Sequence, residues 1–192
     1  MTLRVRPGVG SLRSLAVVRA VEEAFRRMRG REGFRLVHYS IQGNHLHALV
    51  EARDRDALGR GMKALGIRFA KAVNRGLRRT GPVVSDRYHA VVLKAPAQVR
   101  NALRYVLLNG RRHAAQGREG KRNGLKASVR LDPASSARWF DGWSWRPREE
   151  REPPAAPSPT SEPRTWLLAV GWRRRGLIDP ADVPGPFQPA RS

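Results

Sequence analysis

Two pairs of side chains in this sequence have the types and the spacing to act on a phosphodiester. His45 and His47 alternate along a stretch typical of a β-strand, so both imidazoles point to one face, close enough to share an ion. Tyr105 and Asn109 stand four residues apart in a stretch typical of a helix, which places the phenol and the carboxamide on one helical face. Two imidazoles, an amide oxygen and a tyrosine hydroxyl around one ion can break a phosphodiester and keep its energy as a phosphotyrosine.

A metal ion would make such a reaction feasible. A phenol is a poor nucleophile because it ionises only near a pKa of about 10, so the phosphate must be made more reactive. A divalent ion held by His45, His47 and Asn109 would polarise a phosphate oxygen and orient the phosphorus for in-line attack. Mixed nitrogen and oxygen ligands suit Mg²⁺ or Mn²⁺, and zinc stays open. The sequence therefore predicts a divalent metal cofactor.

Each motif has a structural alternative when it is taken alone. Two histidines on one sheet face are often structural or solvated, and Tyr105 can be a core aromatic with a hydrogen-bonded hydroxyl. Tyr88 is the second candidate nucleophile, although packing explains it better, and Tyr39 reads as a sheet residue. The remaining histidines are expected to be structural or to contact DNA: His38, His89 and His113.

The charge of the chain indicates a polyanionic partner. The 192 residues carry a formal net charge of +22, and residues 52–131 hold 20 Lys and Arg against four acidic residues. Such an imbalance favours nucleic acid, and the predominance of Arg suits bidentate phosphate contacts and stacking on unpaired bases. The basic face of the expected helix 56–77 is either solvated or contacts the phosphates along a DNA strand. The candidate DNA contacts are Arg68, Lys71, Arg75, Arg79, Arg104 and Arg112.

Other classes are excluded by composition. The sequence has no cysteine, which rules out disulfides and thiolate zinc sites. It has no apolar run of the roughly 18 residues that a membrane span needs. The N-terminal apolar patch lacks a convincing cleavage site, so we expect no signal peptide and a cytoplasmic location.

The periodicity of apolar residues predicts an α+β fold with the element order β-α-β-β-α-β-α. This order is typical of a ferredoxin-like (RRM-like) antiparallel sheet with helices packed on one face. The expected strands are 2–5, 34–41, 45–51 and 88–93, and the expected helices are 11–29, 56–77 and 96–109.

The character of the sequence changes after this region. We expect a domain over residues 1–115, a basic and aromatic extension over 116–146, a Pro-rich linker over 147–164 and a tail over 165–192 with a possible short helix at 165–175. The irregular extension carries four aromatic residues that either dock onto the domain or stack bases: Trp139, Phe140, Trp143 and Trp145.

Four segments together resemble a known family. They are TLR at 2–4, GFRLVHYSIQGNHLHALVE at 33–51, DRYHAVVL at 86–93 and ALRYVLLN at 102–109. With these motifs the chain resembles the HUH single-tyrosine transposases of bacterial insertion sequences, in particular the REP-associated tyrosine transposase branch. The resemblance covers residues 2–112. Relatives often carry a basic segment before the first strand, which leaves open whether the natural start lies upstream.

The resemblance implies a role for each residue. The family's metal-binding histidines fall on His45 and His47, its nucleophile on Tyr105 and its polar third ligand on Asn109. Residues 1–115 would be the catalytic domain. Such enzymes act on single-stranded DNA beside hairpins in DNA transposition: the tyrosine forms a 5′-phosphotyrosine and frees a 3′-hydroxyl that later reverses the reaction at a new junction.

Two other functions fit parts of the pattern. A rolling-circle replication initiator or relaxase shares the chemistry, but a helicase or larger mobilisation region should accompany it, and none fits here. A non-catalytic RRM-like module that binds single-stranded nucleic acid predicts exposed aromatics on the central strands, where this sequence presents His45 and His47. Whether the protein acts as a monomer or a homodimer stays open.

Overall fold

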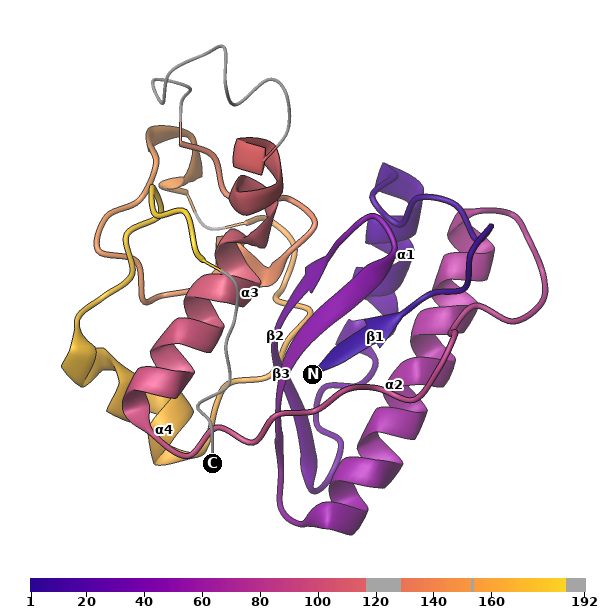
Figure 1. The fold of residues 1–192 in the computed structure, drawn as a ribbon, viewed down its shortest axis with the longest axis horizontal. Helices are drawn as coiled ribbons and strands as arrows, with labels where there is room; N and C mark the ends of the chain where they lie inside the picture. The colour runs from indigo at the N-terminus through magenta and orange to yellow at the C-terminus, as the bar shows by residue number, and fades with distance from the viewer. Residues whose placement is uncertain (117–128, 153, 186–192) are drawn as a thin grey trace.

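The computed structural model describes residues 1–116, 129–152 and 154–185, without the side chains of residues 111–116 and 149. It confirms the α+β class: a three-stranded antiparallel sheet lies between helices (Figure 1). The strands are β1 (Thr2–Arg4), β2 (Phe34–Ile41) and β3 (His45–Ala52). The α-helices are α1 (Leu15–Arg26), α2 (Arg55–Gly76), α3 (Pro96–Gln116) and α4 (Trp166–Ala169), and the 3-10 helices are η1 (Ser136–Trp139), η2 (Arg148–Glu150) and η3 (Gly171–Arg175).

β3 is the central strand of the sheet, because the strand order is β1-β3-β2. In the antiparallel register Thr2 lies opposite His47 and Arg4 lies opposite His45. Residues directly opposite each other on neighbouring strands point to the same face. The side chains of all four residues therefore share one face of the sheet.

The expected strand 88–93 does not form. Instead, residues 83–89 follow the free edge of β1 through separate contacts: Arg6 N donates to Val83 O (2.8 Å), and Thr2 and His89 exchange two backbone hydrogen bonds (2.9 and 3.0 Å). Ser85 N donates to Arg4 O (3.1 Å), so four residues of this segment span only two residues of β1. The surplus residues loop outward and interrupt the ladder.

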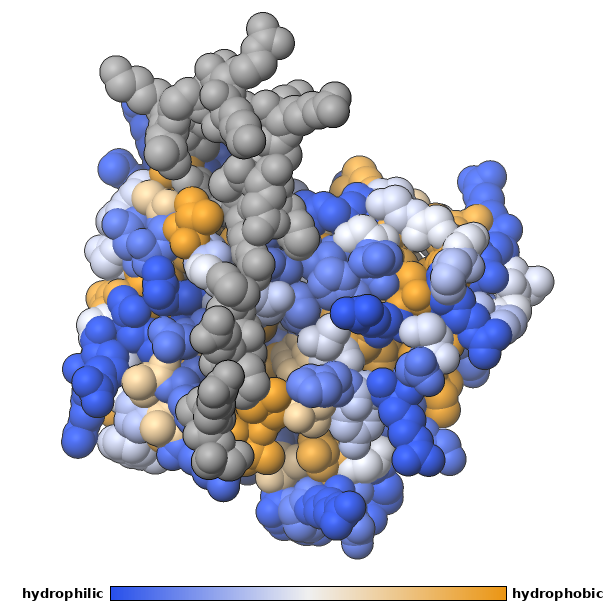
Figure 2. Space-filling view, in the orientation of Figure 1, coloured by the Kyte–Doolittle hydropathy of each residue, from blue (hydrophilic) through white to orange (hydrophobic). Residues whose placement is uncertain are grey.

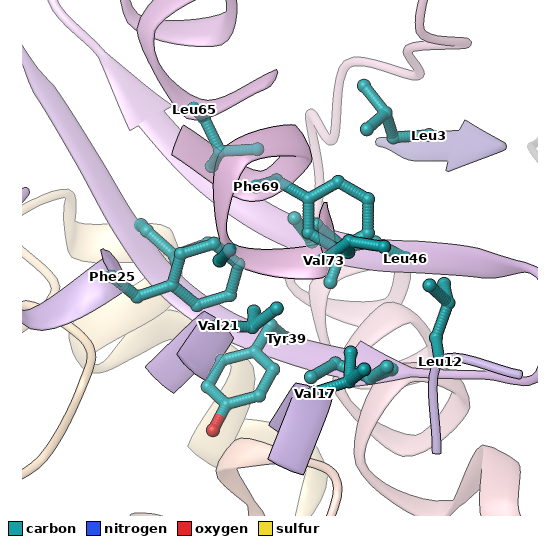
Figure 3. Close-up of a cluster of buried hydrophobic side chains, with 14 of the residues drawn as sticks. Leu3, Leu12, Val17, Val21, Phe25, Tyr39, Leu46, Leu65, Phe69 and Val73 are labelled. Atoms are coloured by element: carbon teal, nitrogen blue, oxygen red, sulfur yellow. The ribbon is translucent and has the colours of Figure 1, made fainter. Parts of the chain in front are cut away.

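The first core fills the space between one face of the sheet and the helices α1 and α2. The alternation of β3 directs Leu46 and Ala48 into it, as the sequence predicts. Ser14 caps α1 through the Val17 amide (3.4 Å), and Asp54 caps α2 through the Ala57 amide (2.7 Å). Figure 3 shows the helical side chains that meet the sheet: Val17, Val21, Phe25, Leu65, Phe69 and Val73.

The second core lies on the opposite face of the sheet, under α3. Leu49 of β3 and Val37 of β2 pack there against α3. The contributing α3 residues are Val99, Ala102, Leu103, Val106, Leu107 and Leu108. The expectation that every helix packs on one face is therefore wrong for α3. Because α3 crosses the histidine-bearing face, that face is an interior surface beside a helix rather than an open platform (Figure 1).

Residues after 128 complete this second core. Phe140, Trp143 and Trp172 are buried against α3, with Phe140 and Trp172 stacked at 5.5 Å between ring centroids. Phe140 and Trp143 thus dock onto the domain, whereas Trp145 is 43% exposed. The aromatic extension is consequently a structural element of the α3 side.

The same C-terminal residues cover the outer edge of β2. Ile41 N donates to Ala134 O, and Ser161 N donates to Leu36 O, both at 2.8 Å. Arg13 forms a bidentate ion pair with Asp132 (2.8 and 3.0 Å) that holds the start of this segment near the end of β2. These contacts cover part of an edge that would otherwise be open to pairing with another strand.

No helix among the described residues combines the length and the apolar character that a bilayer crossing requires. On the face that Figure 2 shows, hydrophilic residues cover both the α2 side and the α4 side, with smaller hydrophobic patches between them.

Candidate active site

The two histidines of β3 face each other directly. Their side chains emerge two residues apart on the strand, and the two Nε2 atoms are 3.0 Å apart. The rings meet edge to face, with 4.5 Å between their centroids. Two unprotonated nitrogens this close repel each other, so the arrangement calls for a shared proton or a shared cation.

Neighbouring oxygens orient both rings through their Nδ1 atoms. His45 Nδ1 lies 2.8 Å from Asn44 Oδ1, and an amide oxygen can only accept, so Nδ1 carries the hydrogen and Nε2 keeps its lone pair in the neutral ring. His47 Nδ1 lies 3.0 Å from the hydroxyl of Thr2, which can accept in the same way. An oxygen behind the distal ring nitrogen is the usual support of a metal-binding histidine.

Helix α3 brings the phenol and the carboxamide to these imidazoles. The Tyr105 hydroxyl lies 3.4 Å from His47 Nε2, with the two rings edge to face at 5.0 Å. One turn later, Asn109 is 1% exposed, and neither of its amide atoms has a hydrogen-bond partner among the described residues. A buried amide without partners costs about 1–3 kcal/mol, so a water, an ion or another ligand at this position would stabilise the structure.

These groups line one cavity of about 550 Å³ between α3, β1, β3 and the segment 85–89. Its wall also includes Arg4 and Arg87, which sequence reasoning missed as site residues. The register of β1 against His45 could have revealed Arg4, but Arg87 reaches the cavity only through the irregular path of its segment. The complete lining is Thr2, Arg4, His45, His47, Ser85, Asp86, Arg87, His89, Tyr105 and Asn109.

The donors in this cavity fit a divalent cation. His45 Nε2 and His47 Nε2 can give two lone pairs, and Asn109 Oδ1 is a buried acceptor without a partner in the described part of the chain. Within that part, no group of three or more His, Cys, Asp and Glu side chains gathers as a candidate metal site, so a site here would depend on the Asn109 amide as its third ligand. The three predicted ligands line one cavity, and a mixed nitrogen and oxygen set accepts Mg²⁺ or Mn²⁺.

The predicted DNA contacts do not lie together. Arg68, Lys71 and Arg75 are exposed on α2, which covers the sheet face opposite the cavity. Arg79 donates to Asn74 Oδ1 (3.0 Å), near the end of that helix. Arg104 on α3 pairs with Asp182 at 2.9 Å. The side chain of Arg112 lies outside the described residues, as does that of His113, so their expected roles stay predictions.

His38, Tyr39 and Tyr88 have structural surroundings, whereas His89 lines the cavity. Burial lowers the pKa of His38 to about 4, and its Nδ1 lies 3.2 Å from Ser136 Oγ. The Tyr39 hydroxyl donates to Glu22 (2.8 Å), and burial raises the pKa of this phenol well above its ordinary value. Tyr88 packs against the first core. Among the three tyrosines of the chain, Tyr105 is therefore the one that lines the cavity.

Comparisons of the chain with family models, with curated proteins and with solved structures found no match.

Proposed function

We propose that this protein is a metal-dependent tyrosine strand transferase that cleaves and rejoins single-stranded DNA near hairpins, the reaction of a DNA transposase. One observation carries the proposal: a tyrosine hydroxyl, two facing imidazole nitrogens and a buried carboxamide without a partner among the described residues line the same cavity. Neither a purely structural histidine pair nor a core tyrosine accounts for a buried amide that the described residues leave without a hydrogen bond.

Each side chain has a role in the proposed reaction. A divalent ion bound by His45, His47 and Asn109 would supply Lewis-acid activation of the phosphate. The Tyr105 oxygen attacks phosphorus, an O–P bond forms, and the bond from phosphorus to the 3′-oxygen breaks. The phenol loses its proton and the 3′-oxygen gains one. Because one phosphate ester replaces another, the reaction needs no nucleotide as an energy source. The 5′-phosphotyrosine conserves the energy of the phosphodiester for rejoining.

The cations of the cavity suit this substrate. Arg4 and Arg87 line the same cavity as the Tyr105 hydroxyl, and a guanidinium binds phosphate oxygens in a bidentate manner. The amide nitrogen of Asn109 has no partner among the described residues and can donate to a phosphate oxygen while its Oδ1 faces the ion. The cavity thus has donors for more than one phosphate oxygen.

The arrangement of elements supports a ferredoxin-like fold as part of this proposal. Residues 83–89 lie beside β1, in the position that a fourth strand takes in a ferredoxin-like sheet. The RRM-like binding module is less well supported, because α3 covers the sheet face on which such a module stacks bases.

The decisive test is a search for a covalent protein–DNA adduct. The protein, Mn²⁺ and a labelled library of single-stranded hairpins would be incubated and run on a denaturing gel, and the attachment residue mapped by mass spectrometry. We predict that Tyr105→Phe abolishes the adduct while thermal stability and hairpin affinity stay close to those of the parent, since the change removes one oxygen and keeps the ring.

Tyr88→Phe is the matched control, because Tyr88 packs against the first core and does not line the cavity. It should form the adduct like the parent. An adduct that persists in Tyr105→Phe and disappears in Tyr88→Phe would identify Tyr88 as the nucleophile. If the parent forms no adduct with any hairpin, a non-catalytic binding module explains the protein better.

A further inference from the structure

A second, smaller cavity adjoins the one that holds the histidines. It has a volume of about 200 Å³ and lies between β3, α3 and the residues that follow His89. Six of its ten lining residues are apolar, whereas polar and charged residues line most of the larger cavity, so we call the smaller one the apolar cavity. The residues that line it and are absent from the larger cavity are Met1, Leu49, Val91, Leu93, Ala102 and Val106.

The two cavities share a wall at the candidate reaction centre. Thr2, His47, His89 and Tyr105 line both of them. A group bound in the apolar cavity and a phosphate bound in the larger cavity can therefore both contact Tyr105. A nucleotide has the same two parts, an anionic phosphate and a flat apolar ring, next to each other.

The polarity of the site changes in order along β3 and α3. At one end His45 and Asn109 lie in the larger cavity, and His47 and Tyr105 border both cavities. At the other end Leu49 of β3 and Ala102 of α3 line the apolar cavity. A strand of DNA placed along this axis would meet cationic and metal-binding groups first and an apolar pocket next.

The volume of the apolar cavity matches one aromatic ring system. Apolar protein cavities of about 150 Å³ bind benzene, and a single nucleobase is somewhat larger. Thr2 and His89 supply hydroxyl and imidazole groups at the shared wall that can bond to the polar edge of a base. Double-stranded DNA cannot fill such a pocket unless a base leaves its stack, which an unpaired strand permits at little cost.

We infer that the 200 Å³ cavity receives the nucleobase next to the scissile phosphate and so fixes the position of that phosphate at Tyr105. This assignment rests on the proposed function for the identity of the phosphate, but the base pocket itself requires only that the protein binds single-stranded DNA. The pocket restricts the reaction to unpaired nucleotides, and its size and polar edge set a base preference at one position.

The test measures whether the bases of a single strand contribute to binding through this pocket. A ten-residue dT oligonucleotide and a fully abasic strand of equal length carry the same phosphates, so the ratio of their affinities reports the contribution of the bases. Fluorescence anisotropy gives this ratio for the parent, for Val91→Trp, which fills the pocket, and for Val92→Trp. Val92 is a matched control because it adjoins Val91, is 73% exposed and does not line either cavity.

We expect the parent and Val92→Trp to prefer the dT strand by about tenfold or more, in keeping with the energy of one stacked base. Val91→Trp should lose most of this preference and bind the abasic strand like the parent. If the melting temperature of Val91→Trp differs from that of the parent, the smaller pocket-filling substitution Val91→Phe is used in its place. Equal preferences in the parent and in a folded pocket-filling variant would overturn the inference.

The adduct assay separates this result from the proposed function. If the parent forms the Tyr105 adduct and the filling variants keep the full preference for dT, the base pocket is wrong and the strand transferase stands. If the preference depends on Val91 but no adduct forms with any hairpin, the pocket is supported and the proposed catalysis fails.

Discussion

At the scale of single residues, the site is defined by two imidazoles that face each other and by a buried amide. The two Nε2 atoms of His45 and His47 approach to 3.0 Å, and the amide of Asn109 is buried without a partner in the described structure. Either feature alone has a structural explanation, such as a shared proton or a trapped water. Both features line the same cavity, and a cation bound by all three side chains would remove both penalties.

Removing either imidazole should therefore remove the metal site. We predict that His45→Ala and His47→Ala each weaken Mn²⁺ binding by at least about 100-fold, since losing even an outer-sphere partner costs 10–100-fold. DNA affinity should change little, because arginines supply it. Isothermal titration calorimetry measures the Mn²⁺ affinity, and the adduct gel measures cleavage.

His89→Ala is the control for this pair, since His89 lines the same cavity but lies beyond the edge of β1. Its Mn²⁺ affinity should equal that of the parent. Undiminished cleavage by both His45→Ala and His47→Ala in chelator-treated buffer would contradict the metal assignment.

Asn109 allows a test in which stability and metal binding change in opposite directions. Because both amide atoms are buried without partners in the described structure, we expect Asn109→Leu to raise the free energy of unfolding of the metal-free protein by about 1–2 kcal/mol. The same variant should require more Mn²⁺ for cleavage, because one oxygen ligand is gone. Thermal melts with and without Mn²⁺ should show a metal-dependent rise in Tm for the parent that is much smaller in the variant.

Asn101→Leu, at an exposed position of the same helix, is the matched comparison and should keep the parental response to Mn²⁺. Destabilisation of the metal-free protein by Asn109→Leu would mean that the amide has a structural partner and is no ligand.

At the scale of elements, one face of β3 performs two tasks. His45 and His47 face the cavity, Leu49 packs under α3, and Glu51 at the far end holds the C-terminal residues. The Glu51 carboxylate accepts hydrogen bonds from Arg164 N (2.8 Å), from Thr165 N (2.9 Å) and from the Thr165 hydroxyl (2.6 Å). A single strand thus fixes both the imidazoles and the segment that packs against the tyrosine-bearing helix.

We predict that Glu51→Gln lowers the free energy of unfolding by about 1–3 kcal/mol, because the substitution removes a charged acceptor and turns an amide donor toward groups that also donate. Urea denaturation measures the change. Glu32→Gln is the control, since its exposed carboxylate lies 3.6 Å from Arg53, and the loss of a surface pair should cost less than about 1 kcal/mol. Equal effects of the two substitutions would mean that the Glu51 contacts add no stability.

Elements with local signals could be predicted from the sequence. The alternation in 34–41 and 45–51 fixed both strands and the common face of the histidines, and the i,i+4 spacing placed Tyr105 and Asn109 together. The apolar stripe of α3 indicated a buried helix but carried no information about which sheet face it covers. The alternation in 88–93 was misleading, because the segment meets β1 with uneven spacing: Ser85 to His89 span only Arg4 to Thr2.

Contacts between residues distant in the sequence had no such signal. Arg104 pairs with Asp182, and nothing local in the sequence indicates that ion pair; its role as a DNA contact stays a prediction. The burial of Phe140 and Trp172 depends on their mutual stacking across the C-terminal segments. The absence of a partner for Asn109 among the described residues is a property of the packed structure alone.

At the scale of the whole molecule, the positive charge surrounds the site without being concentrated in it. The cavity holds Arg4 and Arg87, while the exposed cations of α2 lie on the other side of the sheet. A long DNA would be attracted from several directions, and the cavity arginines would act at the end of its approach.

This distribution predicts how salt affects binding. Each neutralised phosphate on a single strand contributes a slope of about −0.7 to the dependence of log affinity on log salt concentration. We expect a steep slope for the parent, and Arg4→Gln with Arg87→Gln should reduce its magnitude by about 1.4 for a short strand that spans only the cavity. The triple substitution Arg68→Gln, Lys71→Gln and Arg75→Gln on α2 is the control and should leave the slope for this short strand unchanged. Anisotropy titrations at several salt concentrations measure the slopes of the parent and of both variants.

A flat salt dependence in the parent would show that the charge is incidental to binding. A loss of slope in the α2 variant alone would mean that DNA binds on the opposite face of the sheet.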